Sequence, residues 1–580
     1  MNKVQTQTAN CFVKHLYLWI LGITAIYTCG DILLTYIQFH KLFYVDTDCY
    51  THATRIIYWL QNFSWYEQIY PYGNYPFGEI LHFTRLLDII WTILALPLIP
   101  FFSLKEAIFY SGMALSPLCL ALSLIVVFWG LKPFVKQTPK ILLFSFILSF
   151  AFFTKFNNVF DFNRPDHHSV IFLFFAYNIS AVLLNLAKER FRLLFFAGIL
   201  AGCGIWISSA VEGFIFVAAI LGLLFLNWLF NKISLNAIKN YTLGLFIATI
   251  SAWLLNPPYR GYFSFENTRL SAIHLVITFL IYSSFNTLYW FKLKKISAKI
   301  FGTLVCGAVS LTFICYVFNT SIIFASIYDE NIKNSFLPYI TEMKPLWHFV
   351  YLIEMIVFET VLVLMILFYK PQKNHTIEIN LAFLFVFFSF LSLFIERFIL
   401  YELCILAYLN NIFINKLLFK TYKTYKTQNT KYLAFGYICT ALFLLASFRY
   451  EPLHPMKSEE VPQNSVILTD RFASPQFIFD KNIKTVAIPY HSAIAGIADN
   501  HKIFFSTDET EIKRLLQKHQ IQYIFLPYRY FSNSQYYIYP DKNIDKFYGK
   551  IITGKQIYPW LEKINTGSKD ILYKINYQEF

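Results

Sequence analysis

Two segments of the sequence place carboxylates beside other groups that could bind a metal ion or shape a binding site. One is VDTDCYTHATR (45–55), and the other is FNNVFDFNRPDHHSV (156–170). Carboxylate oxygens coordinate hard divalent ions, whereas imidazole nitrogens suit transition metals better than magnesium. These side chains could hold a divalent metal ion if the fold brings them together. The candidate ligands are Asp46, Asp48, Asp166, His167 and His168.

Three further segments each contribute one charged residue of interest. Glu212 lies between two apolar runs, and Glu342 lies in a long polar segment, residues 328–347. The length and polarity of that segment predict a mobile flap over a site, where Glu342 could bind a metal or an acceptor group. Arg397 stands at the end of an apolar helix. Its planar guanidinium could bind a phosphate through two parallel hydrogen bonds.

Each of these groups also has an ordinary structural interpretation. Asp166 could cap the helix that follows it, and Asp46 and Asp48 could be exposed acids of a polar loop. Arg397 could pair with Glu396 or extend toward the membrane interface. No single motif decides between these interpretations, so the arrangement of the elements that carry them matters more.

The composition indicates a polytopic membrane protein. The chain has 580 residues, of which 57% are hydrophobic and only 14% are charged. Soluble domains carry about 25% charged residues. The apolar residues are grouped in runs of about 17–25, long enough to cross a hydrocarbon core of about 30 Å.

The distribution of lysine and arginine gives the expected topology. We expect about thirteen spans, near residues 17–37, 112–131, 141–154, 169–186, 193–210, 213–231, 241–256, 269–290, 299–320, 348–369, 379–395, 398–416 and 432–449. The basic loops between them are 131–140, 187–192, 231–240, 292–299, 369–374 and 415–431. Because basic loops stay cytoplasmic, the N-terminus is expected inside and the C-terminus outside. All the candidate residues above then share the outer face.

These basic loops also explain the net charge of +15, which therefore gives no indication of nucleic-acid binding. If the apolar segment 86–102 crossed the membrane, every later loop would lie on the opposite side from the one expected here. The segment contains Pro97 and Pro100, which interrupt helices. We therefore expect it to be a re-entrant or interfacial part of a long first outer loop, residues 38–111.

The last part of the chain changes character. Residues 1–450 are expected to form the transmembrane domain, and residues 451–580 a small soluble periplasmic α/β domain. Its apolar runs shorten to strand length in VILTD, TVAIPY and QYIFLPY, and the polar stretch DETEIKRLLQKHQ is typical of a helix.

The order of the motifs resembles that of the STT3-type catalytic subunit of oligosaccharyltransferases, in the GT-C glycosyltransferase superfamily. In that family an aspartate of the first outer loop precedes a Thr-Arg pair, and Asp46 and Arg55 have the same spacing here. NYPFG (74–78) is similar to the family's Tyr-Pro-Leu-Gly step. RPDHH occupies the place of the family's D-x-D or D-N-E metal motif, which points to Asp166 and His168.

Three later segments extend the resemblance. SSAVEGF (208–214) is similar to an SSWGGY-like stretch of the family, and YITEMKPLW (339–347) to its S-V-S-E or T-I-x-E motif, which points to Glu342. Arg397-Phe398 matches the family's arginine that contacts the donor pyrophosphate. The number of spans and the outer domain also agree with the family.

The resemblance, which covers roughly residues 15–420, implies roles for these residues. Asp46, Asp166 and His168 would bind a divalent metal ion, and Arg397 would bind the donor phosphate. Asp46 and Glu342 would orient or deprotonate the acceptor. Secondary candidates are Asp48, Arg55, His167 and Glu212.

The chain departs from the family in two motifs. A histidine replaces an acid in the metal motif, which brings Mn²⁺ into consideration beside Mg²⁺. The WWDYG motif, with which the family recognises its acceptor sequon, is absent from the C-terminal region. Transfer to Asn-x-Ser/Thr is therefore not inferred, and the chain is more similar to bacterial relatives without this motif.

We expect a membrane glycosyltransferase of a bacterial inner membrane. It would move a sugar or glycan from a polyprenyl-(pyro)phosphate carrier to an acceptor protein, glycan or lipid on the extracytoplasmic face. An O-antigen-type ligase or polymerase is an alternative that shares the donor. A flippase or transporter of lipid-linked sugar is a second alternative, although transporters usually carry charges inside their spans and have two related halves.

Overall fold

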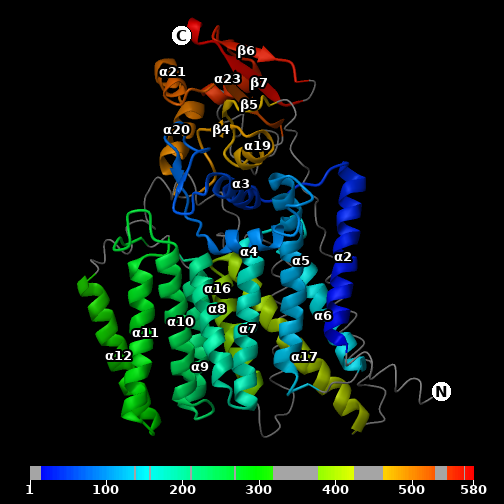
Figure 1. Ribbon diagram of the computed structural model, residues 1–580, viewed down its shortest axis with the longest axis vertical. Helices are drawn as coiled ribbons and strands as arrows, with labels where there is room; N and C mark the ends of the chain where they lie inside the picture. Colours follow the sequence, from blue (N-terminus) through cyan, green and yellow to red (C-terminus); the bar gives the residue numbers. More distant parts are fainter. Residues whose placement is uncertain are drawn as a thin grey trace, which may run out of the picture.

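The computed structural model describes residues 15–135, 139–155, 159–209, 212–266, 269–317, 376–423, 461–490, 492–528, 545–566 and 569–580. A bundle of upright helices carries a smaller region with a β-sheet at one end (Figure 1). The first outer loop lies between the two. Glu342 lies outside the described residues, as do the predicted spans 348–369 and 432–449.

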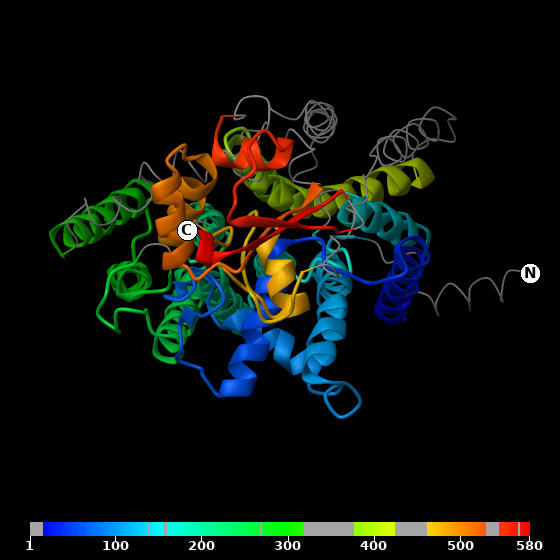
Figure 2. The same cartoon turned by 90° about the horizontal axis from the view of Figure 1, so that it is seen from above.

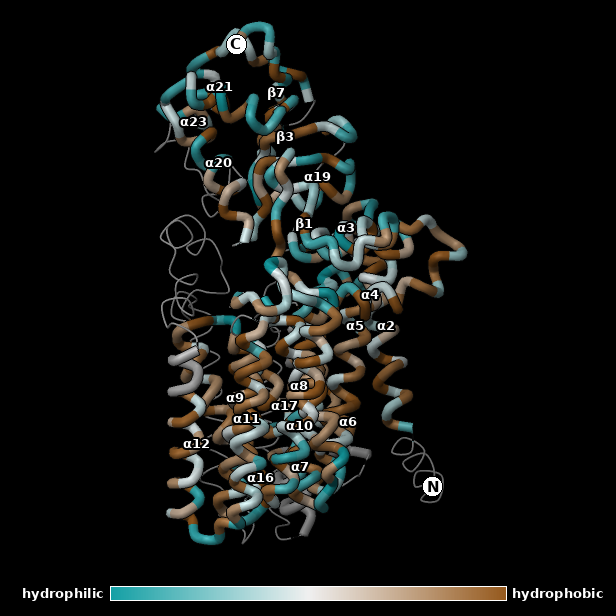
Figure 3. The backbone as a smooth tube through the Cα atoms, turned by 60° about the vertical axis from the view of Figure 1, so that its left-hand side comes forward, coloured by the Kyte–Doolittle hydropathy of each residue, from teal (hydrophilic) through white to brown (hydrophobic). Residues whose placement is uncertain are grey.

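The bundle contains long apolar helices. Those long and apolar enough to cross a membrane, among the described residues, are α2 (Leu16–Phe39), α5 (Leu104–Leu131), α7 (His167–Ala187), α9 (Glu212–Leu229), α10 (Leu235–Leu255) and α11 (Ala272–Phe291). The other helices are α6 (Pro139–Lys155), α8 (Phe191–Ile207), α12 (Ile296–Val317), α16 (Thr376–Ser392) and α17 (Ile399–Lys423). The six candidate spans are consistent with a membrane protein, whereas the total of thirteen stays a prediction. Figure 3 shows that hydrophobic residues dominate the bundle and that hydrophilic residues gather at its lower end and in the upper region.

Small residues allow two of these helices to pack closely. A Cβ atom at Gly198 of α8 would lie 1.9 Å from the carbonyl oxygen of Tyr241 in α10. A Cβ atom at Gly244 of α10 would lie 2.2 Å from the carbonyl oxygen of Phe195. Close backbone approach through small residues is a common way for helices to associate in membranes.

The apolar segment 86–102 does not form a long helix. Helix α4 (Leu86–Ala95) has 10 residues, which corresponds to about 15 Å, and turns follow it to Phe102. This length is about half of a hydrocarbon core. The next predicted span, residues 112–131, lies within α5, which begins earlier, at Leu104, where Ser103 and Glu106 form a capping box.

The first outer loop is held together by a buried ion cluster. Helix α3 (Thr47–Asn62) crosses the upper end of the bundle (Figure 1). In α4, the fully buried Asp88 lies 2.8 Å from Nδ1 of His52, 3.0 Å from Arg55 and 3.4 Å from Arg85. Burial alone would raise the pKa of Asp88, but the charge of Arg55 and the hydrogen bond to His52 lower it below its usual range, with Arg85 adding to this. The cluster fixes α3 against α4.

The C-terminal region contains a five-stranded mixed sheet in the order β4-β3-β5-β7-β6. Its strands are β3 (Val466–Leu468), β4 (Lys484–Thr485), β5 (Tyr523–Leu526), β6 (Leu561–Ile564) and β7 (Ile571–Ile575). The helices are α19 (Ser474–Lys481), α20 (Ile494–Phe505), α21 (Glu509–Lys518) and α23 (Phe547–Thr553). β3 pairs in parallel with β4 and β5, and β7 pairs antiparallel with β5 and β6. Figure 2 shows the sheet from above, over the helices of the bundle.

The first outer loop covers one edge of this sheet. Tyr72 accepts a hydrogen bond from the backbone of Thr485 at 2.8 Å, and the backbones of Asn74 and Tyr75 donate to Val486 and Thr485. The loop itself contains a short antiparallel pair, β1 (Ile69–Tyr70) and β2 (Glu79–Ile80). An exposed strand edge presents unpaired backbone groups, so this contact joins the two parts of the molecule.

The burial of Glu79 beneath this edge predicts pH-dependent stability. Its side chain is only 5% exposed, and burial raises its pKa well above the usual range, although the backbone of Gly496 partly opposes this. A raised pKa contributes stability that is complete below about pH 4.3 and is lost as the pH rises through the folded-state value. Glu79→Gln cannot ionise, so its melting temperature should exceed that of the wild type by a margin that grows from about pH 5 to pH 9.

Thermal unfolding of both proteins in detergent over this pH range measures the effect. Glu562→Gln, at an exposed position of β6, is the control and should follow the wild-type curve. Parallel pH profiles for the wild type and Glu79→Gln would contradict the prediction.

Candidate functional site

The candidate residues lie at the starts of four elements that meet at the upper end of the bundle. Asp46 caps α3, Asp166 caps α7 and Glu212 begins α9. Arg397 lies in η4 (Glu396–Phe398), the short turn between α16 and α17. Alternate helices of the bundle start at the same end, which brings residues that are distant in sequence to a common place.

An arginine joins the first two carboxylates. Nη2 of Arg164 lies 3.2 Å from Oδ2 of Asp46 and 3.7 Å from Oδ2 of Asp166. The side chain of Asp46 is 26% exposed, whereas that of Asp166 is 1% exposed. The two predicted metal ligands therefore share one cation, and only Asp46 is accessible to solvent to an appreciable extent.

Asp166 is surrounded by donors. Its Oδ1 accepts from the backbone of His167 and contacts Nδ1 of the same residue, so the predicted helix cap is confirmed. Nε2 of His168 lies 3.7 Å from Oδ2 of Asp166. Burial alone would raise the pKa of Asp166, but the two histidines and Arg164 hold it well below the usual range. The carboxylate is therefore ionised.

These three neighbours fit a divalent metal ion. One potential ligand atom from each of Asp166, His167 and His168 lies within 4.8 Å of the others, and all three side chains are largely buried. One carboxylate with two imidazoles is a donor set that suits Mn²⁺ or Zn²⁺ as well as Mg²⁺ or better. In sequence the two histidines are adjacent, so the start of a single helix supplies the whole set.

Glu212 connects this set to Arg397. Oε1 of Glu212 lies 3.5 Å from Nδ1 of His168, and its Oε2 lies 3.9 Å from Nη1 of Arg397. Tyr401 donates a hydrogen bond to Oε1 at 2.7 Å, and Ser208 donates to Oε2 at 3.3 Å. A row of alternating acidic and basic side chains thus runs across the upper end of the bundle. Its members are Asp46, Arg164, Asp166, His168, Glu212 and Arg397.

Two of the secondary candidates lie beside this row and not in it. Arg55 contacts Asp88 and donates to the backbone oxygens of Phe83 and Thr84, so its contacts hold the first outer loop. Asp48 lies in the first turn of α3, and its backbone donates to Asp46 at 3.1 Å.

Two residues of the site, and one of the cluster that supports it, were not anticipated from the sequence. Arg164 lies two positions before Asp166, within the motif that drew attention to the region. Tyr401 follows Arg397 by four residues, the spacing at which side chains share one helix face. Asp88 was visible as an ionisable residue within an apolar segment, a pattern that marks a specific role in membrane proteins.

The row can act on a phosphate-linked substrate at the membrane boundary. Its carboxylates and imidazoles can hold a cation, and its arginines can bind anionic oxygens in two places. Because the groups are largely shielded from water, their electrostatic interactions are stronger than in solvent. This arrangement suits the stabilisation of charge that develops on a leaving phosphate.

No protein-family model and no curated protein sequence match the chain. Solved structures do match its fold. The archaeal oligosaccharyltransferase AglB from Archaeoglobus fulgidus, in complex with an inhibitory peptide and a dolichol-phosphate, aligns with a TM-score of 0.66 and 13% identity over 95% of this chain and 80% of that chain. The apo form of the Archaeoglobus fulgidus oligosaccharyltransferase aligns with a TM-score of 0.64 and 15% identity over 88% of this chain and 69% of that chain.

A third structure of the Archaeoglobus fulgidus enzyme, in complex with Zn and sulfate, has a TM-score of 0.58 at 13% identity over 87% of this chain and 67% of that chain. At these identities the similarity establishes the fold. The chain therefore has the fold of the archaeal oligosaccharyltransferase AglB, a GT-C-type homologue of STT3, as the order of its motifs predicted.

Proposed function

We propose that this protein is a membrane glycosyltransferase that moves a sugar or glycan from a polyprenyl-(pyro)phosphate carrier to an acceptor at the face that carries the C-terminal region. The observation that supports this most is the continuous row of charges from Asp46 to Arg397. A fold shared with oligosaccharyltransferases adds to it, since one such structure is bound to a dolichol-phosphate and a peptide.

A divalent ion, Mn²⁺ or Mg²⁺, held by Asp166 and His168 with Asp46 would neutralise charge on the leaving phosphate. His167 is close enough to contribute as well. Asp46 and Asp166 both contact the guanidinium of Arg164, so the two carboxylates already point toward the same place. Their orientation is fixed by helix starts, which reduces the rearrangement required when a cation binds.

Arg397 would bind the donor phosphate. Its side chain is 22% exposed, while that of Glu212 is 3% exposed. Glu212 is hydrogen-bonded by Tyr401 and Ser208 and so has a fixed position from which it orients the guanidinium. A guanidinium can bind phosphate oxygens bidentately.

Asp46 would orient or deprotonate the acceptor, because it is the more exposed of the two carboxylates on Arg164. Glu342 stays the second candidate for this role. The acceptor, which could be a protein, a glycan or a lipid, would approach between the bundle and the C-terminal region. An O-antigen-type ligase or polymerase would use the same donor contacts. The charged residues of the row gather at one end of the bundle, which is less consistent with a transporter.

A metal titration tests the ion site. Wild-type protein in detergent should be stabilised by Mn²⁺ or Mg²⁺, by about 2.7 kcal/mol at a concentration 100 times the dissociation constant. Asp166→Asn should lose this stabilisation while keeping the helix cap, since asparagine caps helices as well as aspartate does. Thermal shift is the measurement. Asp545→Asn, at an exposed carboxylate, should respond like the wild type.

Equal stabilisation of the wild type and Asp166→Asn would place the ion elsewhere. If neither ion stabilises the wild type, an ion site does not form in the absence of the lipid-linked donor, and the prediction is wrong.

Turnover of a polyprenyl-pyrophosphate-linked sugar tests the phosphate site. Arg397→Lys keeps the charge but loses the planar fork, so its rate should fall by about 100-fold or more if two hydrogen bonds stabilise the developing charge. Arg514→Gln, in the exposed part of α21, is the control and should retain the wild-type rate. If Arg397→Lys folds normally and turns over at the wild-type rate, Arg397 does not bind the donor.

A further inference from the structure

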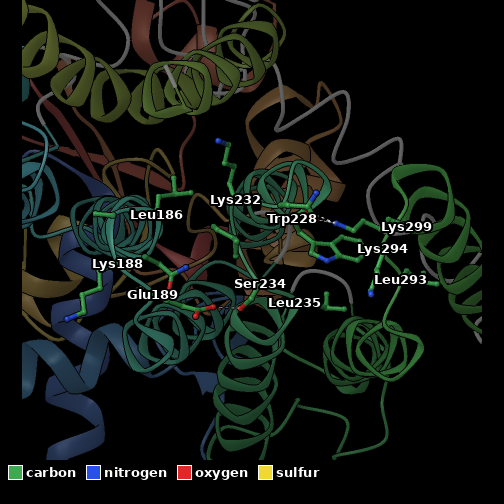
Figure 4. Close-up of a pocket in the computed structure, with 14 residues that line it drawn as sticks. Leu186, Lys188, Glu189, Trp228, Lys232, Ser234, Leu235, Leu293, Lys294 and Lys299 are labelled. Carbon is green, nitrogen blue, oxygen red and sulfur yellow. Dashed lines mark hydrogen bonds between the residues drawn. The ribbon is translucent and has the colours of Figure 1, made fainter. Parts of the chain in front are cut away.

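A cavity of about 740 Å³ lies at the opposite end of the bundle from the candidate site. It is formed where three pairs of helices turn, between α7 and α8, α9 and α10, and α11 and α12 (Figures 1 and 4). This size is typical of pockets that enclose small molecules. None of the residues proposed for glycosyl transfer lines it.

The cavity is strongly basic. Lysines 188, 232 and 294 line it from three different loops and are exposed, and the buried Lys299 forms part of its wall. The acid among the lining residues is Glu189, whose Oε1 already accepts a hydrogen bond from Ser234 at 2.5 Å. Four positive charges therefore surround one carboxylate, so the cavity attracts anions.

Lys299 provides the strongest indication of a ligand. Its side chain is 2% exposed, and its Nζ donates to the backbone oxygen of Trp228 and to Oδ1 of Asn231, both at 2.8 Å. It also lies 4.9 Å from the centre of the Trp228 ring. These partners within the described part of the chain are neutral. A largely buried ammonium group with neutral partners is stabilised by an anion brought close to it.

The cavity also has an apolar side. Leu186 at the end of α7, Leu235 at the start of α10 and Leu293 just after the end of α11 line it. Trp228 is the kind of side chain that is enriched at the boundary between membrane and water. A ligand that carries negative charge at one end and hydrocarbon at the other matches both sides of the cavity.

We propose that this cavity binds the headgroup phosphate of an anionic phospholipid from the leaflet on the side of the basic loops. Basic pockets between membrane helices are known to suit such headgroups. Lysines from all three loops would contact the phosphate, and the leucines would contact the first carbons of the acyl chains. The bound lipid would contact all three helix pairs at once.

The test uses the full-length protein, purified and delipidated in detergent. Phosphatidylglycerol should raise its melting temperature, whereas phosphatidylcholine and inorganic phosphate at equal concentration should not. In the triple variant Lys188→Gln, Lys232→Gln, Lys294→Gln, the apparent dissociation constant for phosphatidylglycerol should rise at least 10-fold. Native mass spectrometry provides a second measurement, the number of phosphatidylglycerol molecules retained by each protein.

A matched control separates the cavity from general positive charge. Arg192→Gln, Lys292→Gln, Lys295→Gln removes three charges from two of the same loops, at positions that do not line the cavity. This variant should bind phosphatidylglycerol like the wild type. Equal loss in both variants would overturn the proposal, because the lipid would then respond to surface charge alone. Stabilisation by inorganic phosphate equal to that by the lipid would overturn the lipid assignment.

Discussion

The structure depends on the high cost of burying charge at the end of an apolar helical bundle. A carboxylate or guanidinium removed from water is stable only when opposite charges and hydrogen-bond donors replace the solvent. The row from Asp46 to Arg397 meets this requirement by alternating the sign of its members. Each interior member therefore contacts a partner on either side, which fixes its position.

The same requirement fixes the first outer loop. Asp88 is fully buried and is surrounded by His52, Arg55 and Arg85. This cluster sets the position of α3, whose first residue follows the cap Asp46. The geometry of the candidate site is thus determined in part by an ion cluster that lies outside it. Both the site and the Asp88 cluster that supports it therefore follow from the cost of burying charge.

The sequence anticipated much of the site because topology alone brings helix starts together. The topology expected from the basic loops was sufficient to group Asp46, Asp166, Glu212 and Arg397 at one end. It could not show which side chains touch, so Arg164 was overlooked. The early start of α5 was not predicted, because hydropathy does not detect a capping box such as that of Ser103.

Contacts between side chains on different helices could not be predicted from the sequence either. Arg55 matched a family motif, but only the structure shows that its partner is Asp88, because the two lie on different helices. Likewise, each lysine that lines the basic cavity, considered within its own loop, indicated only the expected orientation of the chain in the membrane. Their convergence depends on how three helix pairs pack, which local composition does not encode.

The hydrogen bonds between residues 72–75 and the edge strand β4 have a consequence for biosynthesis. A ribosome completes the first outer loop long before it makes residues 484–486, and His519, which contacts the backbone oxygen of Tyr75 at 2.6 Å, follows later still. These backbone groups of the loop therefore remain without their final partners until nearly the whole chain has been made. The contact between the first outer loop and the C-terminal region is completed only at the end of synthesis.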